Sequence, residues 1–216
     1  MLFLSRKTAQ CRRRRGTLHA VACVWVVMTL AGLMALWNYS YSKAGPVEFF
    51  ERWPSDSRIP RPHGTSNLVV FIHPRCPCSI ATLVELARIQ NDLNHHAKVN
   101  ISVVMWQPVH GMLWSESAAH SVCRNITSAT VINDRGGIEA KRFTATASGT
   151  CFLFDEDGRL QFCGGLTQSR GHVGESLESN ILLKVTQQGR QSTVTELPVS
   201  TPVYGCSLFA SSEQLR

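Results

Sequence analysis

Acidic side chains are missing from the beginning of this 216-residue chain, in which no Asp or Glu precedes Glu48. Six of the 22 basic residues precede Gly16, namely Arg6, Lys7 and Arg12 to Arg15. The remaining 16 are balanced by 15 acidic residues, so the net charge of +7 belongs mostly to this short arm. A nucleic-acid-binding domain needs basic residues clustered on its folded part. We therefore expect no nucleic-acid partner.

Sequence motifs of several common enzyme classes are also absent. The chain has no glycine-rich nucleotide-binding loop, no Gly-x-Ser-x-Gly hydrolase elbow, no His-Glu-x-x-His metal helix and no internal repeat. Its eight cysteines match neither the spacing of a zinc ribbon nor that of a small disulfide-rich domain. Six cysteines in one domain are nevertheless compatible with an oxidising compartment.

An uninterrupted apolar run follows the basic arm. Ala20 to Trp37 is broken only by Thr29 and Gly32 and is about as long as the ~20-residue helix that crosses a bilayer. The preceding arginines predict a cytoplasmic N-terminus and an extracytoplasmic C-terminal domain, periplasmic if the source is bacterial. The alternative is a signal peptide cleaved near Ser42 to Ala44, but the run exceeds the usual 7–15-residue signal core. We favour a single-pass, uncleaved anchor.

The rest of the chain divides by composition and hydrophobic periodicity. We expect a basic arm over 1–17, a transmembrane anchor over 18–39, a Pro/Gly-rich linker over 40–65, a domain over 66–187 and a tail over 188–216. Within the domain, apolar runs predict strands over 68–72, 99–106 and 130–132. Helical spacing predicts helices over 79–93, 115–126 and 174–185 and short helical turns over 138–143. Ser115 is the expected N-cap of the helix over 115–126. This alternation, ending in a hairpin over 151–163, predicts an α/β fold with a mixed sheet flanked by helices.

The expected hairpin contains two of the cysteines. Gly158 suits the left-handed position of a three-residue turn. The resulting register sets Phe152 opposite Phe162 and Phe154 opposite Leu160, and it also sets Cys151 opposite Cys163. A cross-strand disulfide and two buried thiols are both open, and we slightly favour the thiols.

The sequence around Cys-Pro-Cys, Phe71 to Ser79, is the main candidate site. Pro77 suits the first position of a helix, which makes Cys76 the expected N-cap. The positive end of the helix dipole there favours the thiolate, which is the reactive form of cysteine, and Arg75 adds positive charge. We therefore predict that Cys76 is the nucleophile and Cys78 the resolving thiol. The Cys-x-Cys ring is tighter than that of Cys-x-x-Cys, and strained disulfides are generally more oxidising.

This stretch resembles the active-site motif of thioredoxins, especially those of the membrane-anchored extracytoplasmic TlpA and ResA type. That motif is Phe-x-Ala-x-Trp-Cys-x-x-Cys, at the junction of a central strand and a helix. Phe71 and Cys76 match it, whereas His73 replaces the Ala and Arg75 replaces the Trp. The resemblance implies a thioredoxin-like fold and thiol–disulfide exchange with protein partners outside the cytoplasm.

Two departures from the family pattern concern the site itself. The second cysteine of the motif falls on Ser79, because Cys78 stands one residue early. The cis-proline that faces the cysteines in the family falls on Gly149, which puts the usual substrate-binding geometry in doubt. Further similarities between 68 and 183 are Asp134, Gly137, Ala140, Phe143 and the turn over 154–158. Cys-Pro-Cys, 164–167, 170–172 and 203–206 also look like segments of the small thioredoxin-like proteins named RedB.

Two other functions remain open. His73, Cys76 and Cys78 offer ligands for Cu(I) or Zn, with His172 or Cys206 completing the set. Thioredoxin-like copper chaperones of the Sco type also use two cysteines and a distant histidine, although their cysteines are spaced Cys-x-x-x-Cys. Alternatively, the domain binds partners without turnover, an option that Gly149 keeps open. We favour an oxidoreductase that needs no cofactor, with Cys206 as a possible third redox thiol.

Overall fold

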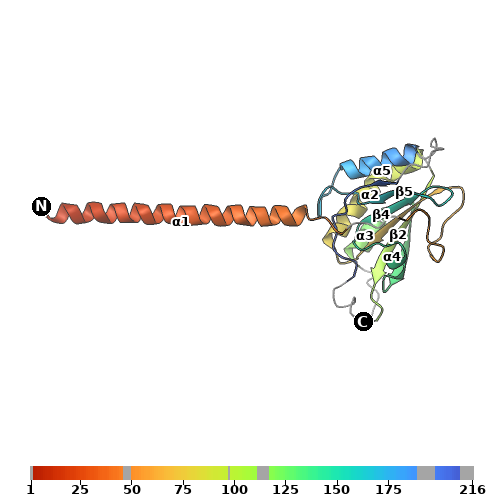
Figure 1. Cartoon of the computed structure of the whole chain (residues 1–216), viewed down its shortest axis with the longest axis horizontal. Coiled ribbons are helices and arrows are strands. Elements are labelled where there is room, and N and C mark those ends of the chain that lie inside the picture. Colours follow the sequence, from red (N-terminus) through yellow and green to blue (C-terminus); the bar gives the residue numbers. More distant parts are fainter. Residues whose placement is uncertain (1, 46–49, 97, 111–116, 189–197, 210–216) are drawn as a thin grey trace. The chain divides into compact units, whose positions relative to one another are not determined.

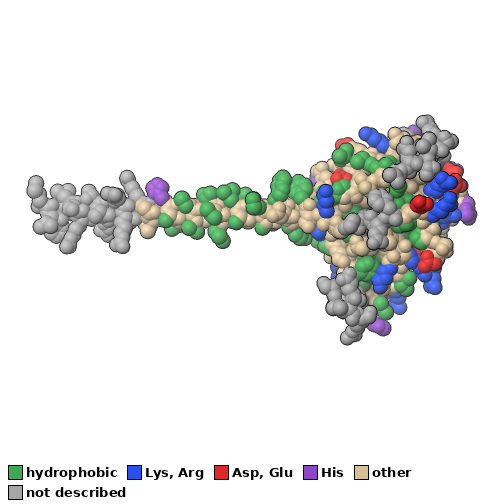
Figure 2. All heavy atoms as spheres, in the orientation of Figure 1, with side chains coloured by type: hydrophobic (Ala, Val, Ile, Leu, Met, Phe, Trp, Pro, Cys, Tyr) green, Lys and Arg blue, Asp and Glu red, His purple; other side chains and the backbone are tan. Residues whose placement is uncertain are grey.

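The computed structural model describes residues 2–45, 50–96, 98–110, 117–188 and 198–209, with the backbone alone for 2–15 and His96. The chain forms two compact units, residues 1–40 and 41–216. The first unit is the helix α1 (Leu2–Ser40). Its part from Gly16 to Ser40 is long and apolar enough to cross a membrane, and none of it is buried. Many hydrophobic side chains lie along this part on the face that Figure 2 shows.

The second unit has a six-stranded mixed sheet in the order β3-β2-β1-β4-β5-β6. The parallel strands β1, β2 and β3 are followed by the antiparallel pair β4 and β5, and β6 lies parallel to β5. The strand bounds are Ser66–Ile72, Val99–Gln107, Ala129–Arg135, Thr150–Phe154, Leu160–Gly164 and Val199–Ser200 for β1 to β6. The expected mixed sheet flanked by helices is therefore confirmed, and its central strand β1 leads into the cysteine motif (Figure 1).

The helices divide between the two faces of the sheet because neighbouring strand residues point to opposite sides. On one face, Leu68, Val70 and Ile72 of β1 pack with residues of α2 (Pro77–His96), α3 (Ala118–Cys123) and α5 (Leu177–Gln188). On the other, Val69 and Phe71 pack with residues of α4 (Ile138–Arg142) and a group of aromatic rings. Both faces of β1 are buried, which explains why its sequence is almost continuously apolar.

The chain before β1 also packs on the domain. Phe50 and Trp53 lie against the second apolar core, and Ile59 is buried within it. The Phe50 ring is 5.3 Å from that of Phe152, and the Trp53 ring is 4.9 Å from that of Phe154, measured between centroids. Residues 50–59 of the expected linker thus cover the aromatic face of the sheet; Phe49 lies outside the described residues.

The helix expected over 115–126 is shorter than its periodicity indicates. It is α3, and its N-cap is Ser117, whose side chain accepts a hydrogen bond from the backbone N–H of His120. Ser115 lies outside the described residues. The periodic positions Val122 and Ile126 still pack on the core, although Ile126 follows the end of the helix. The apolar pattern therefore reported the buried face more accurately than the helix bounds.

The hairpin register differs from the expectation. Gly158 has the predicted left-handed conformation, with φ of 78°, and Phe154 does pair with Leu160. A register shift between Leu153 and Phe154 then leaves Gln161 as an extra residue, so that Cys151 lies opposite Gly164. Phe152 in turn lies opposite Cys163 rather than Phe162. The predicted register, with Cys151 opposite Cys163, was therefore wrong. A one-residue bulge turns the two side chains to opposite faces of the sheet, where they lie in different apolar cores.

Candidate functional site

The cysteine motif lies where β1 ends and α2 begins. The backbone N–H of Cys76 donates to the carbonyl oxygen of His73 at 3.0 Å, and that of Ser79 donates to Cys76 at 3.0 Å. Pro77 is the first residue of α2, where its missing N–H leaves no hydrogen bond unmade. Cys76 therefore lies immediately before the helix, with its sulfur beside the backbone N–H groups of the first turn.

A segment near the C-terminus brings a third cysteine to this helix. The N–H of Ser148 donates to the carbonyl of Cys206 at 2.8 Å, and that of Leu208 donates to Thr146 at 2.9 Å. Gly205 makes this approach possible, because a Cβ there would meet the carbonyl oxygen of Ser148 at 1.7 Å. Residues 198–209, which composition assigned to a tail, thus form β6 and one wall of the site.

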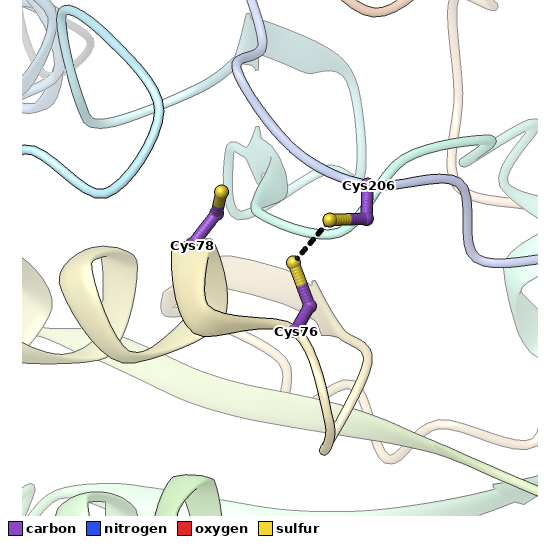
Figure 3. Close-up of side chains that lie close together, drawn as sticks. All are labelled: Cys76, Cys78 and Cys206. Atoms are coloured by element: carbon purple, nitrogen blue, oxygen red, sulfur yellow. Dashed lines mark hydrogen bonds between the residues drawn. The ribbon is translucent and has the colours of Figure 1, made fainter. Parts of the chain in front are cut away.

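Three thiols meet at this junction (Figure 3). The Sγ atoms of Cys76, Cys78 and Cys206 all lie within 4.8 Å of one another. Those of Cys76 and Cys206 are 2.8 Å apart, within hydrogen-bond distance for sulfur. Cys76 and Cys78 are buried, whereas Cys206 is partly exposed. The structure therefore brings together the two cysteines of the motif and the third thiol considered from the sequence.

The three thiols differ in pKa. Burial opposes ionisation of Cys76 and by itself would raise its pKa. Hydrogen bonds outweigh this effect and lower the pKa below its ordinary value of 9.0; they come from the Cys206 thiol and from the backbone N–H groups of Cys206, Cys78 and Ser79. Burial and the charge of Cys76 raise the pKa of Cys78. Burial, the hydrogen bond to Cys76 and the nearby charges raise the pKa of Cys206 to about 12. Of the three thiols, Cys76 is therefore the one that ionises most readily.

Two serines hold the backbone beside the thiols. The Ser79 hydroxyl donates to the carbonyl of His73 at 2.8 Å and lies 2.6 Å from the Ser148 hydroxyl, which accepts the N–H of His73 at 2.9 Å. Gly149 follows with φ of 89°, and its N–H donates to Phe71 at 2.7 Å. The residue aligned with the family's second cysteine thus fixes the loop, and the one aligned with its cis-proline takes a left-handed conformation.

The charged and aromatic residues near the three thiols differ from those that the sequence predicted. His73 is half-buried and stacks on Trp106 at 5.2 Å between ring centroids, and it is not part of the three-thiol group. Burial and then the charge of Arg75 lower the pKa of His73. The cation acting on Cys78 and Cys206 is Arg170, whose guanidinium also donates to the carbonyl of Gly205 at 2.9 Å. Sequence reasoning missed Arg170 and Trp106 as neighbours of the site.

The remaining cysteines of the domain lie outside this cluster. Cys123 and Cys151 belong to one apolar core and Cys163 to the other. Burial raises the pKa of Cys123 to about 11 and that of Cys163 to about 11, and it raises that of Cys151 still further. The His172 ring lies 3.1 Å from the side-chain amide of Gln168 and is partly exposed. These three thiols therefore have the surroundings of buried apolar residues rather than of reactive ones.

The order and direction of the strands define the class of this domain: it has a thioredoxin-like fold. No protein-family model and no curated protein matches the sequence. Among solved structures, an uncharacterized conserved protein from Geobacillus kaustophilus is 19% identical, with a TM-score of 0.52 over 78% of this chain and 92% of its own. A hypothetical protein from Sinorhizobium meliloti is 18% identical, with a TM-score of 0.51 over 67% and 79%.

A third similar structure is described as a putative thioredoxin. It comes from Neisseria meningitidis and is 19% identical over 61% of this chain and 79% of its own, with a TM-score of 0.42. Similarity at this level does not by itself establish a common fold. The thioredoxin-like assignment rests instead on the sheet order, the antiparallel hairpin and the cysteine motif between β1 and α2.

Proposed function

We propose that this chain is a membrane-anchored, thioredoxin-like thiol–disulfide oxidoreductase that acts outside the cytoplasm on protein thiols and disulfides. The observation that carries the proposal is the thiol cluster at the start of α2, in which Cys76 has a lowered pKa and Cys206 lies 2.8 Å from it. Thiolate attack on a disulfide needs an ionised sulfur, a second thiol in reach and access for the partner. Cys76 supplies the first requirement and its two neighbours the second.

The proposed location follows from the basic residues that precede the apolar part of α1. The segment Gly16–Ser40 is preceded by Arg12 to Arg15, and a cluster of basic residues stays on the cytoplasmic side. The thioredoxin-like domain then lies outside, where disulfides form and persist. The anchor would hold the domain at the membrane surface and restrict its partners to proteins that reach this surface.

A second candidate function is binding of Cu(I) or Zn by the three thiolates. Soft thiolate ligands favour these ions, and the three sulfurs lie within 4.8 Å of one another. In the described part of the chain, this group gains no fourth His, Cys, Asp or Glu ligand, whereas structural zinc sites have four. Two sulfurs bound to one zinc ion would lie about 3.8 Å apart, given Zn–S bonds of about 2.3 Å. The 2.8 Å between Cys76 and Cys206 therefore favours disulfide chemistry.

The test of the proposed function is turnover by the full-length protein in detergent. Reduced protein should reduce a disulfide-containing protein substrate when a reductant is supplied, and Cys76→Ser should abolish this activity. Cys123→Ala removes a buried thiol outside the cluster and serves as the matched control. Absence of turnover, together with stoichiometric Cu(I) binding that each cluster cysteine supports, would replace the oxidoreductase with a metal carrier. Absence of both would leave a binding module.

A further inference from the structure

Two thiols lie close enough to Cys76 to resolve a mixed disulfide formed on it. Cys78 belongs to the same motif, whereas Cys206 lies 130 residues further along the chain. We propose that Cys206 is the resolving cysteine, so that the working disulfide joins the start of α2 to the segment that follows β6. This inference rests on the proposed function and specifies which pair of sulfurs performs it.

Helix geometry disfavours the pair within the motif. Pro77 and Cys78 are the first two residues of α2, and positions two apart on a helix do not face each other. Positions three apart do, which is why Cys-x-x-Cys suits a helix start. Here that facing position holds Ser79, whose hydroxyl is bonded to the loop through His73 and Ser148. A Cys76–Cys78 disulfide would have to distort the first turn of α2.

Cys206 is already positioned for bond formation. Its sulfur lies 2.8 Å from that of Cys76, and a disulfide at about 2.05 Å needs an approach of less than ~1 Å. The backbone on either side is fixed, because Arg170 and Ser148 hold Gly205 and Cys206 by hydrogen bonds of 2.9 and 2.8 Å. Figure 3 shows the Cys76 and Cys206 sulfurs pointing toward each other from separate segments.

The exchange balances with a partner disulfide as the oxidant. The Cys76 thiolate attacks one sulfur of the partner, a mixed disulfide forms, and the first partner thiolate leaves and takes up a proton. Cys206 releases its proton to solvent and attacks the Cys76 sulfur as a thiolate, and the second partner thiolate leaves. The partner disulfide is reduced by two electrons, and Cys76 and Cys206 are oxidised to a disulfide.

The mixed disulfide itself promotes the second attack. In the resting site, burial, the hydrogen bond to Cys76 and the charge of Cys76 hold Cys206 protonated. Once Cys76 is bonded to the partner, its charge and that hydrogen bond are gone, while the positive charge of Arg170 remains. Cys206 therefore ionises more readily at the step that needs it.

The test uses reduced full-length protein in detergent and glutathione disulfide as the partner. Peptide mapping of oxidised wild-type protein should recover the Cys76 and Cys206 peptides joined, with little glutathione attached. Cys206→Ser should retain glutathione on Cys76, at least tenfold above wild type. Cys78→Ser should still form the Cys76–Cys206 link, and Cys123→Ala controls for the loss of any thiol.

The two proposals fail in different ways. Glutathione retained in Cys78→Ser, with a Cys76–Cys78 link in oxidised wild type, would overturn the role of Cys206 and leave the oxidoreductase intact. No adduct on Cys76 in any variant, and no link in wild type, would overturn the proposed function itself. Because the mapping of wild-type protein needs no substitution, a folding defect in one variant cannot decide the outcome.

Discussion

At the scale of single residues, hydrogen bonds separate Cys76 from the other thiols of the domain. Three backbone N–H groups and the Cys206 thiol point at its sulfur and overcome the effect of burial. Cys123, Cys151 and Cys163 experience burial alone, which raises their pKa values. A buried sulfur thus has a lowered pKa at the helix start and raised pKa values in the two apolar cores.

The first prediction concerns the pH dependence of alkylation. Because the pKa of Cys76 lies below 9.0 and those of Cys123 and Cys163 are about 11, iodoacetamide should modify Cys76 first as the pH rises. Mass spectrometry of tryptic peptides at successive pH values gives each rate. Equal rates at Cys76 and Cys123 under mildly acid conditions would contradict the electrostatic argument.

The second prediction concerns Gly149. An alanine there would be strained at φ of 89°, and its Cβ would lie 2.9 Å from Oγ1 of Thr82. Gly149→Ala should lower the free energy of unfolding by about 1–3 kcal/mol, measured by denaturant titration. Gly64→Ala is the matched control, because Gly64 also has positive φ, at 69°, but nothing within 4 Å of its Cβ. Equal losses at the two positions would show that contact with Thr82 is unimportant.

At the scale of secondary structure, a one-residue bulge in the hairpin determines on which faces of the sheet Cys151 and Cys163 lie. The sequence predicts its turn, because Gly158 after acidic residues is a strong local signal. The bulge at Gln161 has no comparable signal, since it depends on how β5 packs against the core and pairs with β4. One extra residue moves Cys163 away from Cys151.

The third prediction follows from this register. Because Cys151 and Cys163 face opposite sides of the sheet, they should remain thiols even after oxidation of the protein. Digestion under non-reducing conditions should recover both as separate peptides that react with a thiol reagent only after unfolding. A joined peptide would show that the hairpin has the symmetrical register instead.

The same distinction between local and distant interactions explains what the sequence could predict. Strands β1 and β2 and helix α2 follow from apolar runs and helical spacing within each segment. The position of Pro77 at the helix start follows from its own chemistry. The placement of Cys206 could not be predicted, because β6 has only two residues and its neighbours contact the domain through backbone hydrogen bonds. The glycine at 205 was the available signal, since it permits the close approach to Ser148.

At the scale of the whole molecule, the chain combines one apolar helix with one thioredoxin-like domain. The helical segment from Gly16 to Ser40 has 25 residues and is long and apolar enough to cross a membrane. The domain completes its own cores, including residues 50–59 before β1. The domain therefore needs no residue of the helix for its cores, and the basic arm before the apolar segment sets the proposed orientation.

The fourth prediction tests that orientation. A reporter that is active only outside the cytoplasm, fused after Arg216, should be active, and the protein should remain in the membrane fraction. Replacing Arg12 to Arg15 with glutamine should reduce this activity, because the basic cluster sets the orientation. Activity of a cytoplasmic reporter would reverse the proposed topology, and release of a shortened form beginning near Gly45 would show a cleaved signal peptide.

The fifth prediction links the working disulfide to stability. A bond between Cys76 and Cys206 closes a loop of about 130 residues, which in the chain-entropy view stabilises the fold by up to about 5 kcal/mol. Oxidised wild-type protein should therefore unfold up to about 10–20 °C above the reduced form in a thermal melt. Cys206→Ser should show no such dependence on oxidation. Identical melting of oxidised and reduced wild type would place the disulfide elsewhere.

The long separation between Cys76 and Cys206 also sets an order in time. In the proposed topology, the segment after the anchor crosses the membrane with Cys76 and Cys78 ahead of Cys206, which lies 130 residues further along the chain. Until then the hydrogen bonds that Cys206 gives to Cys76 are missing, and the pKa of Cys76 is correspondingly less depressed. In the proposed topology, the emerging chain therefore has a weaker nucleophile at Cys76 than the folded protein. On this proposal, Cys76 reaches its full reactivity only when the segment that carries Cys206 docks on the domain.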